Sequence, residues 1–94
     1  MRQLWLVLLC AALVLAPASA AAPQAVDRGL VLRVVPPRLA IRELDGTRRG
    51  FGVNGATLVT LNGRPVALSR LRRGDVATVE HRGRVVLSVR ALRP

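Results

Sequence analysis

Short runs in which apolar residues alternate with other residues, each closed by a glycine- or proline-containing turn, fill most of the chain after residue 28. A period of two is the spacing of a β-strand that buries one face. No stretch sustains the i, i+3, i+4 spacing of an amphipathic helix over about ten residues. The pattern therefore predicts an all-β domain.

The turn dipeptides divide this region into short strands. We expect strands at residues 29–35, 38–44, 47–53, 56–61, 76–81 and 84–92, with a short extended piece at 64–68. Turns are expected at Pro36-Pro37, Asp45-Gly46, Asn54-Gly55, Asn62-Gly63 and Arg82-Gly83. Residues 69–73 resemble one helical turn with Ser69 as its N-cap, and Gly50 and Gly52 predict a bulge in the third strand.

Strict alternation assigns the faces of the first and last strands. Leu30, Leu32 and Val34 are expected on one face of the first, with Val31, Arg33 and Val35 on the other; Val85, Leu87 and Val89 are expected on one face of the last. Five to six strands in residues 28–94 predict a small OB-like or SH3-like barrel with one short helical turn, because closure removes exposed edges.

The first 20 residues have the layout of a secretory signal peptide: Arg2, an apolar run over residues 4–16, then Ala18-Ser19-Ala20. The apolar run has 13 residues, whereas a spanning helix needs roughly 20. We expect cleavage after Ala20, with Ala22 as the neighbouring site and retention as a membrane anchor as the alternative. Residues 21–27 are then a flexible tail, and the product is periplasmic or secreted.

Cys10, the only cysteine, lies in this leader, so the exported part forms no disulfide of its own. Without Arg2 it carries 14 arginines, no lysine and five acidic residues, a net charge of +9. Such a charge attracts polyanions. The alternative is that the arginines only keep a β surface solvated and bind no polyanion. Their dispersion along the sequence favours this alternative.

Residues 56–89 resemble an uncharacterised family of bacterial exported domains with an OB-like small β-barrel. The resemblance rests on a Thr-x-Val strand followed by a Leu-x-x-Leu-x-x-Gly-Asp element, here Thr57, Val59, Leu68, Leu71, Gly74 and Asp75. Pro36-Pro37 departs from the family's first turn. The resemblance implies a fold and export but no catalytic residue. In physical terms, Leu68 and Leu71 face the same way and plug a barrel end, Gly74 takes a positive φ, and Asp75 bonds amides of the following turn.

Residues that can carry chemistry are sparse. Ser69, Asp75 and His81 could supply a hydrolase triad, but the Gly-x-Ser-x-Gly elbow is missing, and His81 is expected to be an exposed strand-end residue. No metal-ligand spacing occurs, and Gly46-x-x-x-Gly50-x-Gly52 is neither a Walker sequence nor a Gly-x-Gly-x-x-Gly that opens a helix. Phe51 is the only aromatic residue after the leader, which disfavours sequence-specific nucleic-acid recognition.

These observations predict a non-enzymatic exported module that binds a protein or another envelope component, as a monomer or an edge-paired homodimer. The alternative is an electrostatic binder of anionic polymer or lipid headgroups. The densest basic positions, and the only ones nominated here for anion contact, are Arg48, Arg49, Arg70, Arg72 and Arg73.

Overall fold

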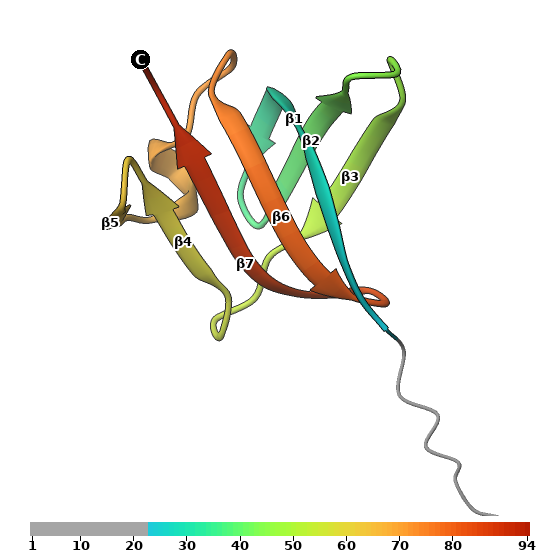
Figure 1. The fold of residues 1–94 in the computed structure, drawn as a ribbon. Helices are drawn as coiled ribbons and strands as arrows, with labels where there is room; N and C mark the ends of the chain where they lie inside the picture. Colours follow the sequence, from blue (N-terminus) through green and yellow to red (C-terminus); the bar gives the residue numbers. More distant parts are fainter. Residues whose placement is uncertain (1–22) are drawn as a thin grey trace, which may run out of the picture.

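The structure is a computed structural model that describes residues 23–94, and it is all-β, as predicted (Figure 1). The predicted leader, its cleavage sites after Ala20 or Ala22 and Cys10 lie outside the described residues. The strands are β1 (Gln24–Val35), β2 (Arg38–Glu43), β3 (Arg48–Gly52), β4 (Leu58–Leu61), β5 (Arg64–Pro65), β6 (Val76–Arg82) and β7 (Val85–Leu92). A single 3-10 turn, η3 (Leu68–Arg70), precedes β6.

All seven strands form one sheet in the order β3-β2-β1-β6-β7-β4-β5. Neighbours pair antiparallel except β4 and β7, which run parallel. The sheet curls until β3 contacts β7 around the core, but in the part of the chain that the structure describes no ladder joins the edge strands β3 and β5. Of the two forms that the sequence allows, a closed or a nearly closed barrel, the described sheet is therefore not the closed one.

β1 begins earlier than predicted. Gln24 to Asp27, expected in a flexible tail, pair with Arg82 to Val79 of β6. Their side chains add polar contacts: Gln24 Nε2 donates to Glu80 Oε2 over 3.1 Å, and Asp27 meets His81. Pairing with β6, and not an apolar alternation of their own, orders these residues, so the period-two pattern could not reveal them.

Two β-bulges change which side chains face the core. The register of β1 with β2 shifts between Val31 and Arg33, so Leu32 is an extra residue. Val31 is buried before the shift, while Val34 packs on the core after it. A bulge inverts the alternation. The predicted single face for Leu30, Leu32 and Val34 is therefore wrong.

The same correction applies to β7. Glu80 pairs with Ser88 and His81 with Val86, which leaves Leu87 as the extra residue. Val86 and Val89 are buried while Val85 is exposed, so Val85, Leu87 and Val89 do not share a face. In β3, by contrast, a bulge was predicted and none is present. The ladder of β2 with β3 is regular, so Gly50 and Gly52 mark no bulge.

The core lies inside the curl and consists of aliphatic residues with one aromatic ring. Its buried members are Val31, Leu39, Ile41, Phe51, Val59, Leu68, Leu71, Ala77, Val79, Val86, Val89 and Ala91. Leu68 and Leu71 are both buried, as predicted, but the N-cap of η3 is Ala67 and no side chain caps it, so Ser69 does not have the expected role. Among residues 23–94, no helix has the length and hydropathy to cross a membrane.

Asp75 anchors the segment between η3 and β6. The residue is 2% exposed, and its carboxylate accepts from Nε and Nη2 of Arg93, each over 2.8 Å, and from the Arg72 amide. The amide that it bonds thus precedes Asp75, where the sequence predicted one in the following turn. Gly74 takes a φ of +97°, as expected, and its N–H donates to the Val31 carbonyl. This network joins the segment to β1 beside the Leu32 bulge.

Candidate functional site

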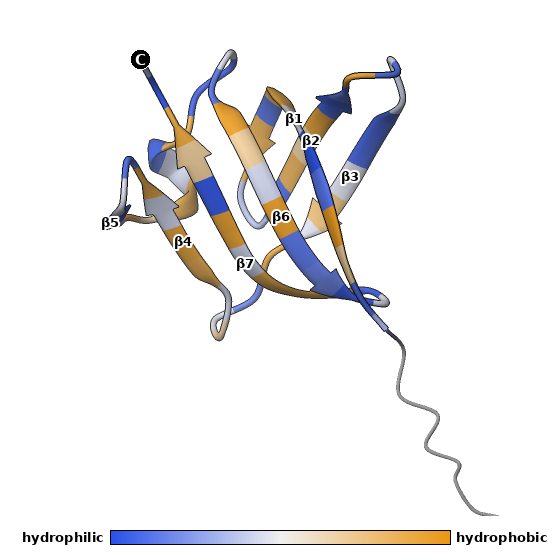
Figure 2. Cartoon of the chain, viewed as in Figure 1, coloured by the Kyte–Doolittle hydropathy of each residue, from blue (hydrophilic) through white to orange (hydrophobic). Residues whose placement is uncertain are grey.

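The outward surface of β1, β2 and β3 carries four exposed arginines, which we call the arginine face: Arg33, Arg38, Arg42 and Arg48. Cross-strand partners share a face of a sheet. Arg42 lies opposite Arg48, and Arg33 lies opposite Ala40, which in turn lies opposite Gly50. Figure 2 shows hydrophilic colour over the first part of β3. Three strands thus bring together arginines that are well separated in the sequence.

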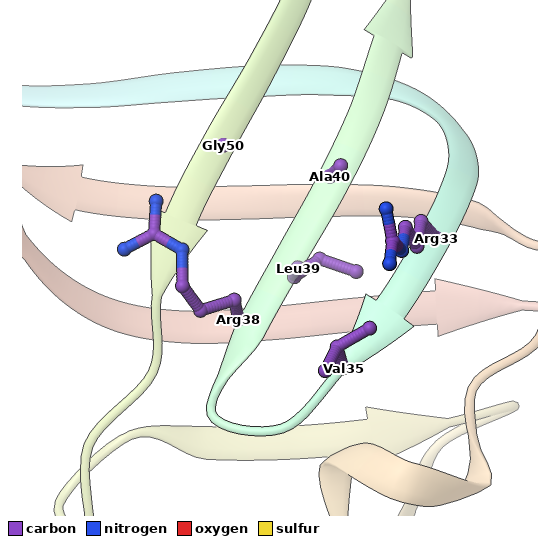
Figure 3. A pocket seen from close by; sticks show the side chains of 6 residues that line it. All are labelled: Arg33, Val35, Arg38, Leu39, Ala40 and Gly50. Atoms are coloured by element: carbon purple, nitrogen blue, oxygen red, sulfur yellow. The ribbon is translucent and has the colours of Figure 1, made fainter.

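A shallow groove of about 330 Å³ crosses this face (Figure 3). Arg33 and Arg38 flank it, and Val35, Leu39, Ala40 and Gly50 complete its lining. A Cβ atom at Gly50 would lie 3.4 Å from Nη2 of Arg38, in van der Waals contact, so that guanidinium lies beside the glycine. Because Ala40 and Gly50 have a small side chain or none, an anionic group can approach the sheet closely between the two guanidinium groups.

Within residues 23–94, none of the four arginines forms an ion pair with a side chain. The acidic side chains are engaged elsewhere, with these partners: Asp27 with His81, Glu43 with Arg49, Asp45 with the Thr47 amide, Asp75 with Arg93, and Glu80 with Ser88 and Arg90. Like charges directly opposite each other destabilise a sheet. An anion on the Arg42–Arg48 pair would relieve that repulsion.

The five nominated arginines are not brought together. Arg48 belongs to the arginine face, but Arg49 points inward, where its Nε lies 2.8 Å from Glu43 Oε2. Arg70, Arg72 and Arg73 lie in the segment between β5 and β6, whose end is hydrogen-bonded to Val31 of β1. Sequence reasoning missed Arg33, Arg38 and Arg42 because it looked for adjacency along the chain. The signal that could have found them is arginines at outward-facing positions, two or four residues apart, in neighbouring strands.

A second polar group, the inner cluster, lies at the end of the concave surface: Asp27, Glu43, Arg49 and His81. His81 Nε2 is 2.6 Å from Asp27 Oδ2, and its Nδ1 is 3.0 Å from the Gly83 carbonyl oxygen. The His81 side chain is only 14% exposed, and its ring centroid lies 5.4 Å from that of Phe51. His81 lies at the end of β6, as expected, but the exposure expected for it is wrong, because the curl of the sheet places Phe51 of β3 beside it.

The carboxyl groups of the inner cluster have opposite pKa shifts. Burial raises the pKa of Asp27, but hydrogen bonds from His81 and Glu43 and the charge of Arg49 outweigh burial, and the pKa is lowered. Burial and the neighbouring Asp27 raise the pKa of Glu43 against the effect of Arg49. As pH rises, Asp27 therefore ionises before Glu43.

The inner cluster is a structural network. His81 is bonded to Asp27, while Asp75 is held by Arg93, so the residues with triad chemistry do not form a relay in the described region. No group of three or more His, Cys, Asp or Glu side chains suited to a metal ion occurs among residues 23–94.

A further cavity of about 460 Å³ lies beside the β3 edge and the β6–β7 turn. Arg38, Arg49 and Arg84 line it together with Phe51 and His81. Arg38 borders both this cavity and the groove, so the basic surface continues around the edge of β3.

Comparison of the chain with protein-family models, curated proteins and solved structures found no significant match.

Proposed function

We propose that this chain is an exported, non-enzymatic binding or accessory module of the bacterial envelope, and that its arginine face contacts an anionic envelope component. The unpaired arginines on one face of three adjacent strands carry the proposal. Four guanidinium groups that form no ion pair with a carboxylate of residues 23–94 offer multiple hydrogen-bond donors to phosphate, sulfate or carboxylate groups. A protein partner with an acidic surface would use the same chemistry.

We also propose that the curled seven-stranded sheet is a small barrel of OB-like or SH3-like type, as in the exported family that the sequence resembles. Small barrels of this kind commonly bind ligands on an exposed strand surface. The edge strand β3 carries Arg48 and Arg49. Two such edges would repel each other, so a monomer is the proposed state over the edge-paired dimer.

Retention on immobilised heparin, a sulfated polyanion, tests the anion contact. We compare the purified protein with R33Q/R38Q/R42Q/R48Q and with R64Q/R70Q/R72Q/R73Q, which removes the same charge from the β5–β6 region. The arginine-face variant should elute at markedly lower salt, because it makes fewer contacts with the anion. Each lost contact also lowers the slope of log affinity against log salt concentration by about one. Equal losses in both variants would show that net charge alone governs retention, and the site would be rejected.

A further inference from the structure

We infer that the anionic partner is a phospholipid bilayer, with the arginine face on the headgroups and Leu44 inserted between them. This inference rests on the proposed function, since it needs the same arginines to bind anions. It adds a second requirement, namely apolar side chains beside the basic ones.

An apolar row continues the arginine face across the outer surface of the sheet. Leu30 lies opposite Arg42 on one side and opposite Val76 on the other, and Val76 lies opposite Leu92. Leu30 is 49% exposed and Leu92 is 54% exposed. Strand pairing therefore places an apolar strip directly beside the guanidinium groups.

Leu44 projects from the turn after β2 and is fully exposed, at 101% of its reference area. It lines a cavity of about 480 Å³ together with Leu30, Val76 and Glu43, flanked by Arg28 and Arg42. The leucine, the apolar strip and two arginines thus form one continuous surface.

The acidic residues next to Leu44 are held by other groups. Glu43 is paired with Arg49 at 2.8 Å on the inner side of the sheet. Asp45 Oδ1 accepts from the Thr47 amide over 2.9 Å, and that bond lowers the pKa of Asp45. Asp45 keeps a negative charge at the turn, but Arg28, Arg42 and Arg48 outnumber it around the patch.

A soluble polyanion needs only the arginines, whereas exposed leucines gain nothing from such a ligand. Basic residues rimming exposed apolar side chains are the composition of surfaces that lie in a membrane interface. Each arginine near an anionic bilayer strengthens partitioning by about fivefold. The combination selects a bilayer among anionic partners.

Co-sedimentation with vesicles tests this inference. We use phosphatidylcholine vesicles with and without about one-third phosphatidylglycerol, and three proteins: the unaltered chain, L44S and L58S. Leu58 is a matched control because it is a 54% exposed leucine at the start of β4. Heparin retention is measured on the same samples, and the urea midpoint verifies that each variant is folded.

We expect binding only to the phosphatidylglycerol vesicles, a loss of about tenfold for L44S and no change for L58S, with heparin retention unaltered in both. Retention on heparin without vesicle binding would overturn the membrane inference while the proposed function stands. Equal vesicle binding by L44S and the unaltered chain would also overturn it. If the unaltered protein binds neither heparin nor vesicles, the proposed function itself is rejected.

Discussion

His81 Nε2 lies 2.6 Å from Asp27 Oδ2, across 54 residues of sequence, while the other ring nitrogen of His81 faces the Gly83 carbonyl. The contact ties the beginning of β1 to the β6–β7 hairpin. Each ring nitrogen of His81 thus lies within hydrogen-bonding distance of an oxygen atom. This bond and the β1–β6 ladder give residues 24–27 a fixed place in the sheet.

Asp27→Asn should loosen the beginning of β1. The amide keeps its size but loses the charge that His81 and Arg49 face. We expect backbone amides of residues 24–28 to exchange with solvent about tenfold faster, with β4 and β7 unchanged, as measured by hydrogen exchange. Gln24→Ala is the control, because its contact with Glu80 is exposed and contributes little. Equal acceleration throughout the sheet would contradict this local role.

Asp75→Asn should lower the free energy of unfolding by about 2 kcal/mol at neutral pH, since hydrogen bonds to a charged group are lost. Hydrogen bonds from Arg93 lower the pKa of Asp75, against the effect of burial. The stabilisation is thus complete above the unfolded pKa of about 3.9 and disappears as pH falls through the lower folded value. Urea titrations should show the two proteins converging in acid. A gap that stays constant with pH would refute the assignment.

Gly29 is required by the close approach of β1 and β2. A Cβ atom there would lie 2.2 Å from the Arg42 carbonyl oxygen, which is backbone and cannot move aside. Gly29→Ala should cost more than about 2 kcal/mol. Gly55→Ala is the matched control, because no atom lies within 4 Å of its added Cβ, and it should be neutral or slightly stabilising. Similar urea midpoints for the two variants would contradict the packing account.

Export is tested by the N-terminus of the protein recovered from the periplasm of an expressing bacterium. The small-x-small site predicts a product that begins at Ala21, or at Pro23 if the neighbouring site is used. Intact mass spectrometry distinguishes these products. A membrane-bound product that retains Met1 would support the anchor alternative.

Strand positions could be predicted because alternation and turn dipeptides are local signals, and β2 starts and ends within one residue of its predicted bounds. The faces of β1 and β7 could not, because the extra residues Leu32 and Leu87 appear only when two strands are paired. The arginine face could not be predicted for the same reason, because it depends on which strands pair. Arg42 and Arg48 become neighbours through the β2–β3 register, while Arg49, adjacent in sequence to Arg48, turns to the opposite surface.

The most direct test of the arginine face is a two-dimensional NMR titration of the protein with a heparin tetrasaccharide at physiological salt. We predict that the largest amide shifts fall on residues 38–42 and 48–52, and that R33Q/R38Q/R42Q/R48Q abolishes them while the spectrum stays dispersed. Shifts centred on residues 70–73, or unchanged shifts in that variant, would contradict the account.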